Sequence, residues 1–230
     1  MKSADKKILA VLFDMDGVLC DSEPMLAIAA CRLFAERYGV NVEPHDFAPF
    51  VGTGEKRYLG GVAEQYGIAR RFADDKDRLY AMYLEMIPGK LQPTPGAREF
   101  VFACRKRGLK TAVATSADRV KLDGALAAID LPPNYFDAIV TGTDITHAKP
   151  DPEIFLTASA KLGLAPAQCL VVEDSPHGII AARKAGCPCL ALATTFAAKK
   201  MAHDKPDWIA ANLNEAREVR ALLGLNGTNE

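Results

Sequence analysis

The sequence predicts a doubly wound α/β fold, in which a parallel sheet carries helices on both faces. Short aliphatic or β-branched runs recur along the chain, and each is followed by a stretch with the periodicity of a helix. Continuous apolar runs of this length are typical of strands buried on both faces of a parallel sheet. The chain contains five such runs, at residues 8–13, 110–114, 138–141, 169–172 and 189–193.

A long segment separates the first predicted strand from the second. The first run ends at residue 13 and the second begins at residue 110, whereas a strand, a crossover helix and the next strand need only about 30 residues. Residues 23–38, 55–66 and 72–87 show helical periodicity, and the sequence between them shows no strand pattern. We therefore expect an inserted α-helical cap domain.

Two stretches rich in helix-breaking and turn-forming residues mark the ends of this insertion. Residues 21–24 contain Asp, Ser and Pro, and residues 88–96 contain three prolines and two glycines. Such residues suit hinges between domains. The expected division is a core domain made of residues 1–21 and 94–230 and a cap domain made of residues 22–93.

Charge and hydrophobicity exclude several classes of partner. The 28 Lys and Arg residues nearly balance the 29 Asp and Glu residues, so the chain lacks the basic excess that nucleic-acid binding requires. The longest uncharged run, residues 185–198, has 14 residues, fewer than the roughly 18 to 20 needed to cross a bilayer. The apolar stretch at residues 8–13 is shorter than a signal-peptide core. We expect a cytoplasmic monomer with no nucleic-acid or membrane partner.

All six cysteines fall inside apolar segments. In a chain without an export signal, such cysteines are more often reduced core thiols than disulfides. We apply the same interpretation to Cys20, which we expect to fill apolar space rather than to sense oxidants.

Two acidic residues directly follow the first predicted strand. Asp14 and Asp16 are two positions apart, and side chains with this spacing on an extended chain point the same way. Two carboxylates so close together need a cation or a shared proton. On this pattern alone, a solvated acidic turn explains the pair equally well.

Polar residues also follow the next three strands. Thr115 and Ser116 end the second run, where a hydroxyl and free backbone N–H groups suit either a phosphate oxygen or a helix N-cap. Lys149 follows the third run, and the proline after it favours extended backbone. Glu173 and Asp174 end the fourth run, where burial of two acids requires a metal or another cation.

The order of these groups is more specific than any one of them. Right-handed crossovers bring the carboxyl ends of parallel strands to one edge of the sheet. The topology therefore predicts that four carboxylates, a hydroxyl and an ammonium group meet in one crevice.

In this order the motifs resemble those of the haloacid dehalogenase superfamily. The chain is most similar to the β-phosphoglucomutase and phosphoglycolate phosphatase group, which has a helical cap inserted after the first motif. The resemblance runs from Leu9 to about Thr194 and includes all four signature motifs, among them residues 148–155. It implies a Rossmann-like core and an enzyme acting on a small phosphorylated metabolite.

The resemblance also implies a role for each core motif. Asp14 would be the nucleophile that accepts the phosphoryl group. Asp16 would protonate the leaving oxygen and later deprotonate water. Thr115 and Lys149 would hold the phosphoryl oxygens, with backbone N–H groups near Ser116 contributing.

The cofactor implied by the resemblance is Mg²⁺. Asp174, an Asp14 oxygen and the backbone carbonyl of Asp16 would bind the ion, with Glu173 contributing directly or through water. Hard oxygen ligands of this kind suit Mg²⁺. A phosphorylated aspartate intermediate would split the displacement into two steps.

Cap residues bear on which reaction follows phosphorylation. The sugar-phosphate mutases of this superfamily have a basic residue and a His where this chain has Glu55 and Leu26, and both differences weaken a mutase interpretation. Lys56 and Arg57 lie alongside and could substitute, although basic residues on such a helix are more often solvated. We keep Glu55, Lys56 and Arg57 as candidate substrate-binding residues.

Three functions fit this pattern, two of them enzymatic and one a signalling function. The favoured one is a Mg²⁺-dependent phosphatase, since Asp16 is the acid that the dehalogenases lack and that the P-type ATPases replace with Thr. The alternative is a β-phosphoglucomutase-like mutase. A receiver-like signalling domain is the remote alternative, because it also uses acids, Thr or Ser, a Lys-Pro pair and Mg²⁺.

Overall fold

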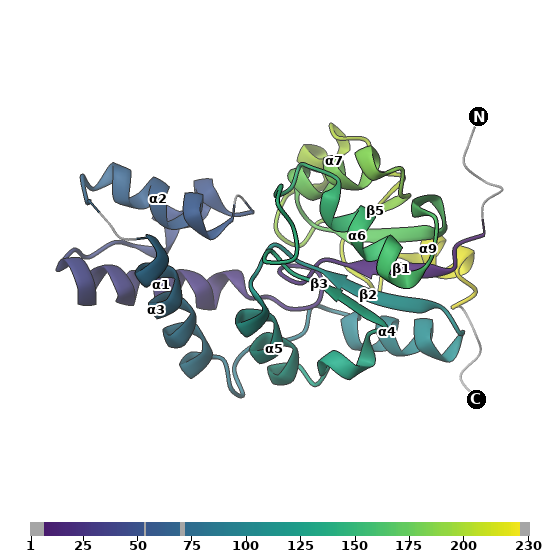
Figure 1. Cartoon of the computed structure of the whole chain (residues 1–230), viewed down its shortest axis with the longest axis horizontal. Helices are drawn as coiled ribbons and strands as arrows, with labels where there is room; N and C mark the ends of the chain where they lie inside the picture. The colour runs from purple at the N-terminus through teal and green to yellow at the C-terminus, as the bar shows by residue number, and fades with distance from the viewer. Residues whose placement is uncertain (1–6, 53, 70–71, 226–230) are drawn as a thin grey trace.

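The computed structural model describes residues 7–52, 54–69 and 72–225 and contains one parallel sheet (Figure 1). The six strands lie in the order β3-β2-β1-β4-β5-β6, and every neighbouring pair is parallel. The doubly wound α/β prediction is confirmed. The strands are β1 Ala10–Phe13, β2 Lys110–Ala114, β3 Ala138–Val140, β4 Cys169–Glu173, β5 Cys189–Leu192 and β6 Trp208–Ala210.

Four of these strands lie inside the predicted runs, and β4 extends one residue beyond its run. The sixth strand, β6, was not predicted. β6 has three residues, none of them fully buried, and pairs only with β5 at the edge of the sheet. An edge strand of this kind carries no continuous apolar run, because one of its sides is not covered by another strand.

The buried side chains alternate along the central strand β1. Val11 and Phe13 belong to one hydrophobic core, while Ala10 and Leu12 belong to the other. This alternation is the two-residue period of a strand. Helices α4 Ala97–Lys106, α5 Arg119–Ala128 and α9 Arg217–Leu222 contribute to the first core, and α6 Glu153–Leu162, α7 Pro176–Ala185 and α8 Ala198–Ala202 to the second.

The segment between β1 and α4 forms the predicted helical insertion, which projects from the sheet in Figure 1. Its helices are α1 Glu23–Tyr38, α2 Glu55–Gln65 and α3 Phe72–Met86, together with the 3₁₀ segment η1 Pro44–Phe50. The helices agree with the predicted ranges to within one residue, whereas η1 was not predicted. Two further 3₁₀ turns, η2 Pro133–Tyr135 and η3 Pro166–Gln168, connect core elements.

The two predicted linkers lie side by side. The backbone N–H of Asp21 donates to the carbonyl of Gln92 at 3.1 Å, and that of Thr94 donates to Leu19 at 3.1 Å. Both chain crossings between the helical insertion and the sheet are thus joined at one place. The hydrophobic core of the insertion is continuous with one core of the sheet, so the domain boundaries at residues 22 and 93 stay a prediction.

The six cysteines are free thiols, and five of them are buried. Burial raises the pKa of the Cys20 thiol well above its usual value, and the Asp16 charge raises it further. A buried thiol of this kind is poorly reactive. No helix in the described part of the chain is long and apolar enough to cross a membrane.

Candidate active site

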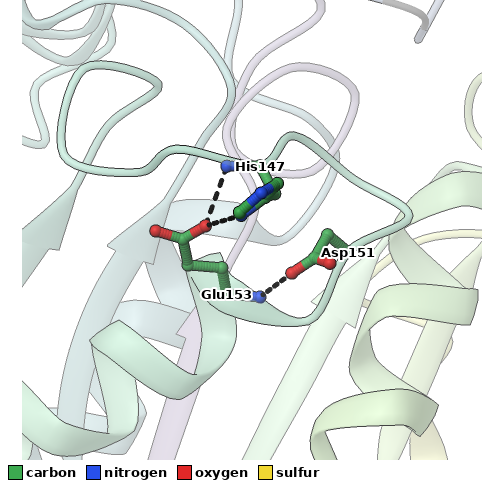
Figure 2. Close-up of side chains that lie close together, drawn as sticks. All are labelled: His147, Asp151 and Glu153. Atoms are coloured by element: carbon green, nitrogen blue, oxygen red, sulfur yellow. Dashed lines mark hydrogen bonds and ion pairs between the residues drawn. The ribbon is translucent and has the colours of Figure 1, made fainter.

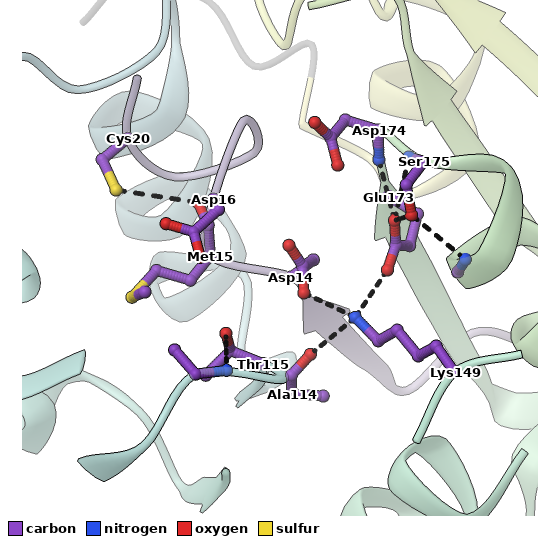
Figure 3. A network of polar contacts seen from close by, with 12 residues as sticks. Asp14, Met15, Asp16, Cys20, Ala114, Thr115, Lys149, Glu173, Asp174 and Ser175 are labelled. Carbon is purple, nitrogen blue, oxygen red and sulfur yellow. Dashed lines mark hydrogen bonds and ion pairs between the residues drawn. The ribbon is translucent and has the colours of Figure 1, made fainter. Parts of the chain in front are cut away.

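The predicted crevice lies at the carboxyl edge of the sheet (Figure 3). Asp14 follows β1 directly, Thr115 follows β2, and Glu173 is the last residue of β4. The register explains their proximity, because Phe13 at the end of β1 is paired with Val113 on one side and Val172 on the other. The side chains that end three adjacent strands therefore converge.

Lys149 connects two of the acids. Its ammonium Nζ lies 2.5 Å from Oδ1 of Asp14 and 2.6 Å from Oε1 of Glu173, and it donates to the Ala114 carbonyl at 3.3 Å. The Lys149 side chain is 7% exposed, so its charge acts with little screening by water. Burial lowers the pKa of Lys149, but the charges of Asp14 and Glu173 raise it by more, so the net shift is upward. The ammonium therefore stays charged.

A braced loop positions Lys149. Figure 2 shows the Glu153 carboxylate accepting from the backbone N–H of His147 and from its ring Nδ1, at 2.8 and 2.9 Å. The same carboxylate accepts from the N–H of Thr146 at 2.9 Å, and Asp151 accepts from the N–H of Glu153 at 3.0 Å. These bonds attach the loop to the first turn of α6. His147, Asp151 and Glu153 lie close together in Figure 2 because these hydrogen bonds join them. Their proximity is therefore explained by the loop structure without a metal ion.

Asp14, Glu173 and Asp174 form a buried acidic group. Each offers a carboxylate oxygen, and these oxygens lie within 4.8 Å of one another. Burial raises the pKa of Asp14 to about 7, with Lys149 acting in the opposite direction. Burial also raises the pKa of Asp174 well above its usual value, and Glu173 and Asp14 add to this effect. Three acids against one ammonium favour a bound cation.

The donors and the space around this group fit Mg²⁺, which prefers carboxylate and carbonyl oxygens. A Cβ atom on Gly17 would lie 1.9 Å from Oδ2 of Asp174, so only glycine lets the loop after β1 approach that carboxylate. Among the described residues, Asp14, Glu173 and Asp174 are the side chains that could hold the ion.

The oxygens of Glu173 already accept several hydrogen bonds. Oε1 accepts from Lys149, while Oε2 accepts from the backbone N–H of Asp174 and Ser175 at 3.0 and 3.1 Å and from the Ser175 hydroxyl at 2.9 Å. A Cβ atom on Gly178 would lie 1.9 Å from this carboxylate. Glu173 thus organises Lys149 and the start of α7.

Asp16 lines the same cavity as Asp14 but pairs with a different lysine. Its Oδ2 accepts from Nζ of Lys121 at 2.8 Å, and its Oδ1 accepts from the Ser22 hydroxyl. Lys121 is 2% exposed although it lies on α5, whereas the neighbouring Val120 is 55% exposed. Sequence analysis missed Lys121. One signal was available: the apolar face of this amphipathic helix includes the position of Lys121, whereas the apolar Val120 falls on the solvent face.

Thr115 and Ser116 both line the cavity in front of Asp14. The Thr115 hydroxyl accepts from the backbone N–H of Ala117 at 3.1 Å, so it shapes the turn that leads into α5. A Cβ atom on Gly142 would lie 2.3 Å from the Ser116 carbonyl, which shows how closely the loop after β3 approaches this turn.

The helical insertion supplies the other wall of the cavity. Glu55 lines it, as predicted for a substrate-binding residue. Lys56 instead lines an adjoining groove together with Ser116 and Lys149. Arg57 does not line the cavity; it forms an exposed ion pair with Glu64 at 2.7 Å, and its guanidinium lies 5.0 Å from the centre of the Phe50 ring. The structure therefore brings Glu55 to the site and leaves Arg57 outside it.

Other cavity-lining residues of the insertion were not predicted as site residues. Glu23 and Leu26 come from α1, and Tyr58 comes from α2. Burial raises the pKa of Glu23 to about 7, and the charge of Asp16 raises it further. A Glu at a helix start and a Tyr on an apolar helix face are common structural residues, so the pattern alone could not single them out.

Residues 8–186 match the family of haloacid dehalogenase-like hydrolases. The chain is 45% identical over 194 residues to the protein SUPPRESSOR OF QUENCHING 1, chloroplastic, of Arabidopsis thaliana, a match that covers 83% of this chain and 18% of the plant protein. It is 35% identical over 177 residues to a phosphorylated carbohydrates phosphatase of Thermotoga maritima, covering 77% of this chain and 81% of that enzyme.

Two further similarities concern a bacterial enzyme and a solved structure. Hexitol phosphatase B of Escherichia coli is 31% identical over 185 residues, which are 80% of this chain and 82% of that protein. The crystal structure of a haloacid dehalogenase family hydrolase from Deinococcus radiodurans with bound phosphate and sodium superimposes with a TM-score of 0.74. It shares 27% identity, over 96% of this chain and 98% of that one.

Proposed function

The chain is a phosphatase of the haloacid dehalogenase-like hydrolase family, and we propose that it hydrolyses phosphorylated sugars and related small metabolites with Asp14 as the nucleophile. The observation that carries the proposal is the pairing of Lys149 with Asp14 and Glu173 in a buried acidic site. In this proposal residues 1–21 and 94–230 form the catalytic core, and residues 22–93 form the cap over it.

The first step would transfer the phosphoryl group to the protein. An Asp14 oxygen forms a bond to phosphorus while the bond from phosphorus to the leaving oxygen breaks, and Asp16 donates a proton to that oxygen. Lys149 and the N–H groups near Ser116 would stabilise the charge on the phosphoryl oxygens.

The second step would return Asp14 to its free form. Asp16 removes a proton from water, the water oxygen forms a bond to phosphorus, and the bond between phosphorus and Asp14 breaks to release inorganic phosphate. Asp16 lines the same cavity as Asp14 and is held in place by Lys121 and Ser22, which supports its assignment as the residue that transfers the proton.

Asp14, Asp174 and the backbone carbonyl of Asp16 would hold Mg²⁺, and we expect Glu173 to contribute indirectly because its oxygens already accept hydrogen bonds. When bound, the ion supplies positive charge that offsets repulsion between the anionic nucleophile and the anionic substrate. Within the described residues, Lys149 supplies the only other positive charge in direct contact with Asp14.

The cavity favours hydrolysis over the mutase alternative. A mutase must bind a second phosphate, yet the two lysines that line the cavity in the described part of the chain, Lys121 and Lys149, are already paired with carboxylates. Glu55 lies where the mutases have a basic residue. Incubation with β-glucose 1-phosphate should therefore release inorganic phosphate rather than produce glucose 6-phosphate.

The direct test is Mg²⁺-dependent release of phosphate from p-nitrophenyl phosphate. Replacement of the nucleophile in Asp14→Asn should lower kcat by roughly a thousandfold or more, and removal of divalent ions with EDTA should abolish turnover in the wild type. Asp123→Asn is a matched control, because Asp123 forms an exposed ion pair with Arg119 on α5. Normal turnover in Asp14→Asn would refute the assignment.

A further inference from the structure

Two buried polar atoms in the active-site cavity have no hydrogen-bond partner within the described residues. They are Oε2 of Glu23 and the hydroxyl oxygen of Tyr58. Tyr58 is 3% exposed, and both residues line the same cavity as Asp14 and Asp16. Buried polar atoms are almost always paired in folded proteins, so unpartnered ones on residues that line a cavity point to a ligand that completes them.

The cap wall around these atoms is acidic. Glu23 begins α1 and Glu55 begins α2, so both carboxylates lie at the start of a cap helix and line the cavity. Glu55 accepts from the Tyr80 hydroxyl at 2.5 Å. The cation that faces them is Lys121, which is already paired with Asp16 at 2.8 Å.

Apolar side chains complete this wall. Leu26 and Phe50 line the cavity next to the acidic residues and are at most 9% exposed. A ligand here would thus meet apolar surface for its carbon atoms and hydrogen-bond acceptors for its polar groups.

We propose that Glu23, Glu55 and Tyr58 form a subsite that binds the hydroxyl or ammonium groups of the substrate's leaving group and rejects a second anionic group. This subsite rests on the proposed function, because the phosphoryl group bound at Asp14 would place the leaving group against the cap wall. The preferred substrates are monophosphates of polyols or amino polyols. A bisphosphate would bring its second phosphate against two carboxylates without a free cation in the described lining.

The proposal is tested by the ratio of kcat/KM for glucose 6-phosphate to kcat/KM for p-nitrophenyl phosphate, whose leaving group has no hydrogen-bond donor. Loss of one hydrogen bond should lower this ratio about tenfold in Tyr58→Phe and about tenfold in Glu23→Leu, which has no acceptor. The matched control is Tyr66→Phe, since Tyr66 is an exposed cap tyrosine whose hydroxyl donates to Asp46 at 2.7 Å. The control should keep the wild-type ratio.

Substrate panels identify the donor group. A higher kcat/KM for glucosamine 6-phosphate than for glucose 6-phosphate that disappears in Glu23→Gln assigns an ammonium group, and equal values assign a hydroxyl. Fructose 1,6-bisphosphate should be hydrolysed at least about tenfold less efficiently than glucose 6-phosphate. A bisphosphate preference, or an unchanged ratio in both variants, would overturn the proposal.

Binding separates failure of the subsite from failure of the proposed function. Absence of phosphate release from every ester would refute the function, but calorimetry on the Asp14→Asn protein still measures the subsite. Adding Tyr58→Phe to that protein should weaken binding of glucose 6-phosphate about tenfold, measured against inorganic phosphate as the reference. Equal weakening of both ligands, or of neither, would contradict the subsite.

Discussion

The two walls of the active-site cavity differ in how their polar atoms are satisfied. On the core wall, Asp14, Lys149 and Glu173 hold one another through short ion pairs. On the cap wall, Glu23 and Tyr58 carry buried oxygen atoms that have no partner among the described residues.

This difference indicates a division of labour. Groups that are fixed before substrate arrives lower the reorganisation needed in the transition state, which suits the wall where phosphorus reacts. Groups without partners are completed by a ligand, which suits the wall that selects the leaving group. Substitutions on the core wall should therefore affect every substrate, and those on the cap wall should affect only some.

The largest effect is expected for Lys149→Met. The variant removes the charge that we propose stabilises the phosphoryl oxygens, so kcat should fall roughly a thousandfold for all substrates. It also leaves Asp14 and Glu173 buried without their cation, which should lower the free energy of unfolding by about 3 to 5 kcal/mol. Steady-state assays and urea unfolding measure both.

Lys161→Met is the control for this variant, since Lys161 is an exposed lysine of α6 that pairs with Asp144. Lys161 also donates to the Ile139 carbonyl at 2.9 Å, so the variant should leave kcat unchanged and lower the free energy of unfolding by no more than about 1 kcal/mol. A Lys149→Met protein that is folded and fully active would contradict the claim that the core wall is required for every substrate.

A smaller effect is expected for Lys121→Met. Met has a similar length but cannot hold Asp16, so kcat should fall about tenfold to a hundredfold through misplacement of the proton carrier. The loss should appear in kcat while KM changes little, whereas a purely structural role would lower the free energy of unfolding and leave kcat of the folded protein in place.

The matched control is Lys184→Met, at an exposed position on α7. Unchanged kcat in a folded Lys121→Met protein would show that this buried lysine has no part in positioning Asp16.

The smallest effect is expected for the stability of Tyr58→Phe. Removing a buried hydroxyl that lacks a partner should raise the free energy of unfolding by up to about 1 kcal/mol. A stabilised protein with a weaker preference for polyol phosphates would mean that the hydroxyl is kept for binding. A loss of stability measured by urea unfolding would instead reveal a structural role.

The fold was largely predictable because its signals are local. Apolar runs such as residues 110–114 mark strands that are buried on both faces, and the gap up to residue 110 marks the insertion. β6 escaped prediction because an edge strand needs no continuous apolar run. The 3₁₀ segment η1 escaped because it lacks helical periodicity over enough residues.

The cavity residues that end strands could be predicted for a topological reason, while most of those on helices could not. Parallel strands carry Asp14, Thr115 and Glu173 to one edge whatever the detailed packing. Glu23 and Lys121 reach the cavity only because of how helices α1 and α5 are rotated about their axes. Sequence spacing does not determine that rotation for single charged residues.

The most direct test of the account is to trap the phosphorylated protein. Wild-type enzyme mixed with Mg²⁺ and a phosphate ester, then quenched in acid during turnover, should carry one phosphoryl group on the peptide that contains Asp14, as detected by mass spectrometry. Asp14→Asn should carry none. Turnover without any phosphoryl group on that peptide, or with the group on a different residue, would contradict the role of Asp14.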